Sequence, residues 1–230
     1  MKKFVNTIKL LAVIIVLLEL CFICGCQNNE EVVYIEDSNQ IENDIASTPI
    51  PATPSPSPEV TERPKIIRDD ADFRNAKWGD SIEDVLEYDY DATLTRDGDD
   101  LIGDCVVADK NAEVYYIFEN DKLVSGGYYF DLDTSNGWRY ISAYDEIKSM
   151  LLEVYGDPIV DKIHYVYGES LTDFMDDVLA LEAGYTVYAA QWETNTTEIL
   201  LGMFAENYDI NFLLTYEDIN YEEPKDYSGL

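Results

Sequence analysis

Residues 101–131 read LIGDCVVADKNAEVYYIFENDKLVSGGYYFD, in which three apolar, strand-like runs alternate with short polar turns. The runs cover residues 101–108, 113–119 and 123–131. The polar segments between them, DKN and NDK, are too short for a crossover connection, so neighbouring runs are expected to pair as antiparallel hairpins. A further strand-like run at residues 92–96 joins through the turn DGDD, which extends the predicted meander to four strands.

A short helix is predicted just before this meander. The tetrapeptide DSIE at residues 80–83 is typical of a helix N-cap followed by an acidic residue at the third helical position, here Glu83. Ile82, Val85 and Leu86 then share one helical face. The pattern stops within about two turns, so the helix is expected to be short.

The rest of the chain repeats this order with one insertion. A capping pattern at residues 142–145 begins a second helix with apolar positions up to Val154, and Gly156 followed by Pro158 ends it. A strand, a helix and three strands are predicted after it, at residues 159–167, 171–183, 185–193, 197–205 and 210–216.

Together these elements predict an α+β fold built as a tandem helix-plus-antiparallel-meander repeat. The order is helix, four strands, helix, strand, helix, three strands. Two sheets are expected, with the helices packed on one face of them. The predicted folded domain spans residues 66–230 and consists of two similar halves, about 66–139 and 140–230.

The N-terminus has the composition of a secretory signal peptide. Three lysines precede an apolar run at residues 10–18, and this run is short for a membrane span. The segment ends in ICGC, residues 23–26, which resembles the bacterial lipobox. The resemblance implies a lipoprotein signal peptide at residues 1–25, lipidation of Cys26, and a lipid anchor at the extracytoplasmic face of a bacterial cell membrane. The alternative is a plain signal peptide or signal anchor with incidental cysteines.

Residues 26–65 are predicted to form the lipidated cysteine and a disordered tether rich in Pro, Ser and Thr. Six of the eight prolines lie within residues 49–64. Such a composition favours extended polyproline geometry over a packed core. The tether is therefore expected to hold the folded domain away from the membrane.

The charge of the chain limits its partners. The sequence has 47 acidic and 15 basic residues, a formal net charge of −32. A surface of this sign repels phosphate backbones, which argues against nucleic-acid binding. A basic protein partner or a cationic cell-wall component would suit this charge.

The search for catalytic chemistry is negative. Cys105, the cysteine that remains beyond the lipobox, lies in an apolar strand and is expected to be an inert, buried thiol. His164 is the only histidine and is expected to have no catalytic role. P-loop, H-E-x-x-H and G-x-S-x-G motifs are absent. We therefore predict that the protein is not an enzyme and has no cofactor; a carboxylate hydrolase would need a deep cleft.

Calcium is the one metal ion that the sequence makes worth weighing. Residues 131–137, DLDTSNG, resemble the first half of an EF-hand loop, but the Gly is one place late and Ser142 stands where a bidentate Glu is needed. Asp131 and Asp133 are therefore weak candidate ligands, as are Asp97 and Asp99 in the first predicted hairpin. Weak association of Ca²⁺ follows from the charge density alone.

Tyrosines suggest a protein-binding surface. The chain has 18 of them, and many occupy predicted strands. A sheet with one covered face leaves some phenol rings in water, where they favour protein contacts. The candidates for this surface are Tyr115, Tyr128, Tyr165 and Tyr185. The simpler alternative is that most tyrosines complete the core.

Two short motifs carry a family resemblance. Residues 78–85, WGDSIEDV, resemble the W-G-x-S-x-E-x-V start of many uncharacterised bacterial lipoproteins, and residues 155–158, YGDP, resemble the end of a helix in the same proteins. More distantly, the pattern is similar to the SmpA/OmlA lipoproteins and to the β-lactamase-inhibitor-like fold, which implies a helix followed by an antiparallel meander. The expected function is a non-catalytic protein-binding or scaffold module at the cell envelope; the resemblance also suggests an inhibitor or regulator of a secreted enzyme.

Overall fold

The computed structural model describes residues 68–89, 93–132, 134, 136–168 and 175–222. The chain divides into two compact units, Met1–Pro64 and Lys65–Leu230, and every described residue belongs to the second. No helix in the described ranges is long and apolar enough to cross a membrane. The predicted signal peptide, Cys26 and the tether lie outside the described residues.

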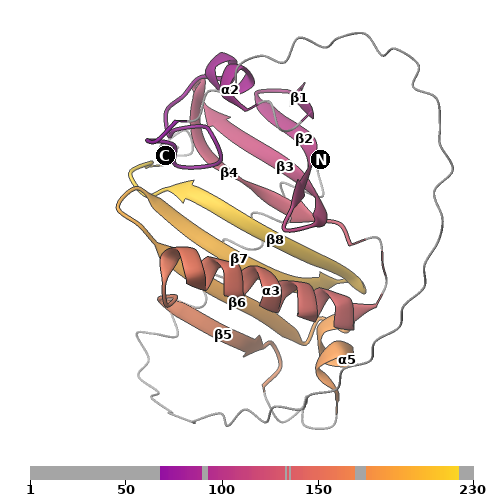
Figure 1. Cartoon of the computed structure of the whole chain (residues 1–230). Helices are drawn as coiled ribbons and strands as arrows, with labels where there is room; N and C mark the ends of the chain where they lie inside the picture. Colours follow the sequence, from indigo (N-terminus) through magenta and orange to yellow (C-terminus); the bar gives the residue numbers. More distant parts are fainter. Residues whose placement is uncertain (1–67, 90–92, 133, 135, 169–174, 223–230) are drawn as a thin grey trace, which may run out of the picture. The chain divides into compact units, whose positions relative to one another are not determined.

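The described residues form one antiparallel sheet of eight strands, in the order β1-β2-β3-β4-β8-β7-β6-β5, together with three helices (Figure 1). The strands are β1 (Thr93–Asp97), β2 (Asp100–Val107), β3 (Lys110–Glu119), β4 (Lys122–Phe130), β5 (Val160–Tyr165), β6 (Thr186–Glu193), β7 (Thr197–Glu206) and β8 (Asp209–Asp218). The helices are α2 (Ile82–Tyr88), α3 (Gly137–Tyr155) and α5 (Asp177–Glu182).

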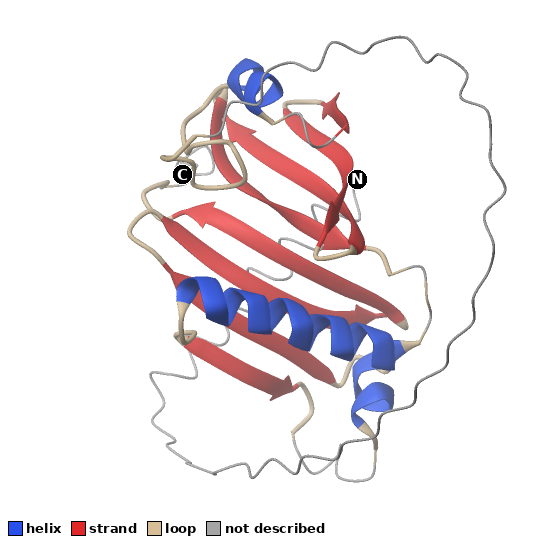
Figure 2. Cartoon of the chain, viewed as in Figure 1, coloured by secondary structure: helices blue, strands red, loops and turns tan. Residues whose placement is uncertain are grey.

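The α+β class and the antiparallel pairing are confirmed, but the expectation of two sheets is wrong. β4 and β8 pair with each other over residues 125–129 and 213–217. The last strand of an isolated meander leaves a row of unpaired backbone N–H and C=O groups at its edge. Pairing β4 with β8 satisfies both rows and merges the two meanders into one continuous sheet (Figure 2).

Three hairpins turn tightly, as the short polar segments predicted. Each has two successive residues with positive φ at its centre, and these pairs are Ala108 and Asp109, Asn120 and Asp121, and Asn207 and Tyr208. Positive φ at both central positions gives the turn a twist that matches the twist of the flanking strands. Asn and Asp tolerate this conformation, whereas Ala108 and Tyr208 adopt it at a conformational cost.

All three predicted helix starts are displaced, and the helix expected at residues 171–183 is the shorter α5, which begins at Asp177 with Asp176 as its N-cap. Ser81, not Asp80, is the N-cap of α2, and it forms a capping box with Asp84, one residue beyond the expected Glu83. Helix α3 begins at Gly137, with Asn136 as its N-cap, rather than at the capping pattern near Ser142. Its predicted end is confirmed, because Gly156 is the C-cap with a φ of 77°.

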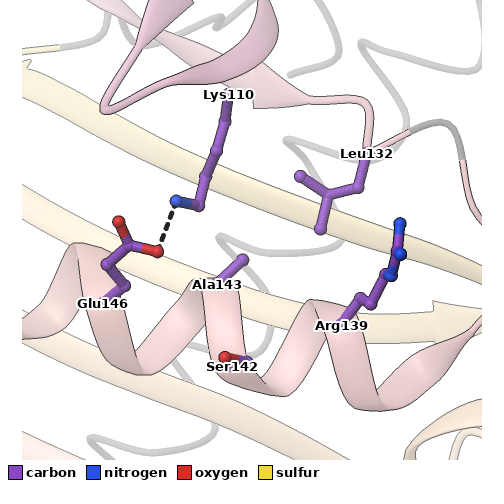
Figure 3. A pocket seen from close by; sticks show the side chains of 6 residues that line it. All are labelled: Lys110, Leu132, Arg139, Ser142, Ala143 and Glu146. Carbon is purple, nitrogen blue, oxygen red and sulfur yellow. Dashed lines mark hydrogen bonds and ion pairs between the residues drawn. The ribbon is translucent and has the colours of Figure 1, made fainter. Parts of the chain in front are cut away.

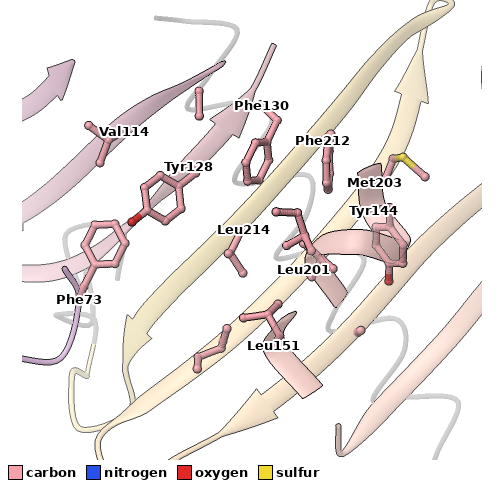
Figure 4. Close-up of a cluster of buried hydrophobic side chains, with 14 of the residues drawn as sticks. Phe73, Val114, Tyr128, Phe130, Tyr144, Leu151, Leu201, Met203, Phe212 and Leu214 are labelled. Carbon is pink, nitrogen blue, oxygen red and sulfur yellow. The ribbon is translucent and has the colours of Figure 1, made fainter. Parts of the chain in front are cut away.

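The hydrophobic core lies between the sheet and the helices, and all three described helices are on the same face. Helix α3 contributes Tyr140, Tyr144, Ile147 and Leu151 to it, and α2 contributes Ile82 and Val85. The Tyr144 ring lies 5.5 Å from that of Tyr188 on β6 and 6.2 Å from that of Phe212 on β8. Figure 4 shows Tyr144, Phe212 and other side chains of this core. Since α3 covers strands β7 and β8 and α5 also contacts β6, the C-terminal strands are covered on this face.

Residues 72–81, which contain the W-G-x-S motif, connect the two halves of the sheet. Gly79 N–H donates to Leu123 O (2.8 Å), and Leu123 N–H donates to Asp80 O (2.8 Å), at the start of β4. Trp78 Nε1–H donates to Thr197 Oγ1 (2.9 Å), at the start of β7. The motif therefore has a structural role in the fold.

Candidate interaction surface

The sheet has a second apolar face, opposite to the helices, which we call the helix-free face. On β7, Ile199, Leu201 and Met203 belong to the core, so Leu200 and Phe204 point to the other side of the sheet. The same alternation places further apolar side chains there from β3, β6 and β8, namely Tyr115, Val187, Ala189 and Leu213. None of the three helices in the described part of the chain lies on this face.

The centre of the helix-free face is apolar and closely packed. The exposed fractions are 2% for Leu213, 3% for Phe204 and 4% for Leu200. Val187 is paired with Phe204 across β6 and β7, and Leu213 is paired with Gly202 across β7 and β8. These side chains are therefore already buried in the structure and do not form an exposed apolar patch.

Tyr115 joins this apolar centre to charged groups at its border. Its hydroxyl lies over Gly127, where a Cβ would be only 2.4 Å from the Tyr115 oxygen, so a glycine is needed at this position. Burial raises the pKa of Tyr115, and the carboxylate of Glu217 raises it further. The phenol is therefore kept neutral at the edge of an acidic region.

Three glutamates form a row across the helix-free face at one end of the apolar centre. Glu193 on β6 is paired with Glu198 on β7, and Glu198 is paired with Glu217 on β8. Like charges at directly paired positions of neighbouring strands repel and destabilise a sheet. We call Glu193, Glu198 and Glu217 the glutamate row.

A second acidic pair borders the apolar centre on the side of β2 and β3. Asp104 is paired with Glu113, and Glu113 is paired with Tyr129. Burial raises the pKa of Glu113, and the neighbouring carboxylate of Asp104 adds to this effect. At the opposite edge of the face, β5 carries Lys162 and His164, paired with Ala189 and Val187.

The four tyrosines of the predicted binding surface are not brought together. Tyr115 lies on the helix-free face, whereas Tyr128 is buried in the core, 5.3 Å from the Phe73 ring. Tyr165 is half-buried at the end of β5, and Tyr185 is half-buried before β6, with its ring 5.3 Å from that of Tyr167. Only Tyr115 thus contributes to the centre of the helix-free face.

Sequence reasoning missed most of this face. Residues 199–204 are apolar at successive positions, as are residues 187–190. An uninterrupted apolar run, as opposed to an alternating one, indicates a strand with both faces apolar. Strands β6 and β7 carry this signal, whereas the predicted binding surface was based on the positions of tyrosines.

The weak calcium candidates are scattered in the structure. Asp97 and Asp99 lie in the β1–β2 hairpin, Asp131 follows β4, and Asp133 lies outside the described residues. Within the described ranges no group of three or more His, Cys, Asp and Glu side chains is arranged to hold a metal ion. Asp97, Asp99 and Asp131 therefore belong to no such group among the residues that the structure describes.

A buried charged cluster beneath the sheet was not anticipated from the sequence. Arg74 donates two hydrogen bonds to Asp89, of 2.6 Å and 3.0 Å, and the Tyr116 hydroxyl also donates to Asp89. Burial alone lowers the pKa of Arg74, but the bond to Asp89 outweighs it and the pKa is raised. Cys105, expected to be buried, is only half-buried. Its partial burial raises the pKa of the thiol, which disfavours the nucleophilic thiolate.

One shallow pocket of about 270 Å³ opens on the helix side, between α3 and the start of β3 (Figure 3). Its lining includes Lys110, Arg139, Ser142 and Glu146, and Lys110 Nζ lies 2.6 Å from a Glu146 carboxylate oxygen. These side chains include no base positioned to activate the Ser142 hydroxyl. The pocket does not have the composition of an acyl-transfer site.

Comparisons with known proteins do not assign this chain to a family. No protein-family model matches the chain, and no curated protein or solved structure matches it either. The features that bear on function are therefore the acidic charge, the exposed aromatic side chains such as Tyr167, and the lipobox-like N-terminus.

Proposed function

We propose that this protein is a lipoprotein anchored through Cys26 at the extracytoplasmic face of a bacterial membrane, and that residues 66–230 act as a non-catalytic protein-binding or scaffold module. The structural observation that supports the proposal is Tyr167, which is 62% exposed just after β5 with its ring 5.3 Å from that of Tyr185. Exposed tyrosines are typical of protein-binding surfaces. The net charge of −32 favours a basic protein partner.

The anchor is tested first. Cys26→Ser is expected to block acylation, because the diacylated residue is the cysteine that ends the ICGC motif. Incorporation of labelled palmitate and partition of the protein between membrane and soluble fractions measure this. Cys24→Ser is the control, and it is expected to keep both properties. Unchanged labelling of the Cys26→Ser protein would refute the anchor.

The binding surface is tested by site-specific photocross-linking in intact cells. A photoreactive amino acid at Tyr167, which is 62% exposed, is expected to trap one defined envelope protein, which then binds the purified lipoprotein directly. The control carries the same amino acid at Val154, which is 70% exposed on α3. Absence of a cross-link from Tyr167, or the same products from both positions, would overturn the proposal.

A second candidate function is inhibition or regulation of a secreted enzyme. The element order favours it: each half has a helix before its strands, and the last strands, β4 and β8, meet in the middle of the sheet. We propose that these halves are the tandem repeat, as the resemblance to the β-lactamase-inhibitor-like fold implies. If the cross-linked partner is an enzyme, addition of the purified lipoprotein would reduce its activity in proportion to complex formed.

A further inference from the structure

We propose that the pocket between α3 and the start of β3 binds a small carboxylate, and that Arg139 and Lys110 hold its anionic group (Figure 3). The apolar part of the ligand lies against Leu132 and Ala143, which also line the pocket. This site is separate from the proposed protein-binding role, since its ligand is a small molecule.

The first argument is the charge state of Arg139. The other arginines that the structure describes, Arg68, Arg74 and Arg96, each form an ion pair with a carboxylate. Arg139 is exposed, forms no ion pair with another described residue, and extends from α3 toward Leu132 (Figure 3). A guanidinium group presents its N–H donors in a planar fork that matches the two oxygens of a carboxylate. The Arg139 guanidinium is therefore available to a ligand.

Lys110 contributes a second cation, which the fold holds in place. Its Nζ donates to Ala108 O (3.1 Å) and to a Glu146 carboxylate oxygen (2.6 Å). An ammonium group has three N–H donors, so these two bonds leave one donor for a ligand. The lining of the pocket thus carries two cations and one carboxylate, a local excess of positive charge within a chain of net charge −32. This excess suits a ligand with a single negative charge.

Helix α3 places the polar and apolar parts of the lining side by side. Arg139, Ala143 and Glu146 follow one another at intervals of four and three residues, a spacing that puts them on one face of the helix. Ala143 therefore lies between the two charged ends of this face, and Ser142 adds a hydroxyl group beside it. Leu132, which follows β4, adds a second apolar side chain. A ligand that joins a carboxylate to a short apolar group matches this arrangement.

The size of the pocket limits the ligand further. Its volume is about 270 Å³, whereas sites for drug-sized ligands have about 300 to 1,000 Å³. At physiological ionic strength charges are screened over about 8 Å, so the cations of the pocket outweigh the more distant acidic residues. A phosphate ester brings a second negative charge toward Glu146 and matches the pocket less well. A small monocarboxylate is the ligand class that fits both the volume and the charge.

The direct test is a saturation-transfer difference NMR titration of isocaproate with the processed lipoprotein in phosphatidylcholine nanodiscs, with empty nanodiscs as the blank. Isocaproate is expected to give a signal above the blank that saturates, and its affinity is expected to fall with added salt. Isocaproamide has the same shape without the charge, and it is expected to bind at least about tenfold more weakly. Isoamyl phosphate is also expected to bind more weakly than isocaproate.

The variant Arg139→Gln is expected to weaken binding of isocaproate by about tenfold or more. Its melting temperature should stay nearly unchanged, because Arg139 is exposed, and this excludes unfolding as the cause of lost binding. Arg96→Gln is the matched control, since it removes the same charge from an exposed arginine that pairs with Glu83, and it is expected to keep the affinity within about twofold. Arg139→Lys keeps the charge but loses the planar fork, so its affinity should be intermediate.

The outcomes separate this inference from the proposed function. A signal no greater than that of empty nanodiscs, equal affinities for isocaproate and isocaproamide, or equal losses in Arg139→Gln and Arg96→Gln would overturn the site. Tighter binding of isoamyl phosphate than of isocaproate would overturn the assignment to a carboxylate. Cross-linking from position 167 depends on none of these measurements, so the failure of one proposal leaves the other standing.

Discussion

The indole Nε1–H of Trp78 donates a hydrogen bond of 2.9 Å to Oγ1 of Thr197, a residue 119 positions later in the chain. Beside it, Thr196 Oγ1–H donates to an Asp72 carboxylate oxygen (2.7 Å). These two hydrogen bonds connect the segment before α2 to the β6–β7 hairpin. The domain therefore contains direct contacts between the segment that precedes its first described helix and a hairpin in the second half of the sheet.

Trp78→Phe is expected to lower the free energy of unfolding by about 1 kcal/mol, because it removes the donor to Thr197 while keeping an aromatic ring. Urea denaturation followed by circular dichroism measures the change. Trp138→Phe is the control, since Trp138 is 61% exposed at the start of α3, and it should leave the midpoint nearly unchanged. Equal effects of the two substitutions would contradict this role of Trp78.

Asp89→Asn is expected to destabilise the domain by about 3 to 5 kcal/mol, because it leaves the Arg74 guanidinium buried without its anionic partner. Chemical denaturation of the purified protein gives the change in free energy of unfolding. Asp70→Asn is the comparison, since Asp70 pairs with Lys77 in an exposed setting and its loss should have little effect. Similar losses for both variants would show that burial of the Arg74 pair is unimportant.

Stability is expected to fall above about pH 10, the ordinary pKa of tyrosine. Burial raises the pKa of Tyr188 to about 12, and burial likewise raises the pKa of Tyr128 to about 12. The neutral phenols are therefore favoured in the folded state. Their contribution is complete below the unfolded pKa and is lost as the pH rises from there through the folded value.

Melting temperatures measured between pH 8 and about pH 12 would reveal this loss. Tyr188→Phe should make the decline less steep, whereas Tyr208→Phe, at an exposed turn, should not. A melting temperature that does not change across this range would rule out the contribution of the buried phenols.

Divalent cations are expected to act as counterions only. Ca²⁺ and Mg²⁺ at equal ionic strength should raise the melting temperature equally, because both screen the repulsion within a chain of net charge −32. Differential scanning calorimetry compares the two ions. A shift specific to Ca²⁺ that disappears in the Asp131→Ala, Asp133→Ala double variant would instead reveal a calcium site in that loop.

Local sequence patterns were reliable where short-range chemistry decides the conformation. The two-residue turns at Ala108 and Asp109 and at Asn120 and Asp121 lie in the polar segments that predicted hairpins. Gly156 ends α3 because glycine readily adopts the positive φ found at this position. At the start of α2, however, Asp80 and Ser81 both suit an N-cap, and Asp80 instead accepts hydrogen bonds from Arg68 and from Lys77 N–H.

The sequence by itself determined the α+β class, the antiparallel strands and the acidic charge, because these follow from periodicity, turn length and composition. Only the tertiary structure decided that β4 pairs with β8, because the sequence of an edge strand does not specify which other strand it pairs with. That pairing sets the register that places Tyr129 beside Leu213 and Ser125 beside Glu217. The continuous eight-stranded sheet is therefore a product of long-range strand pairing, which no local pattern in the sequence specifies.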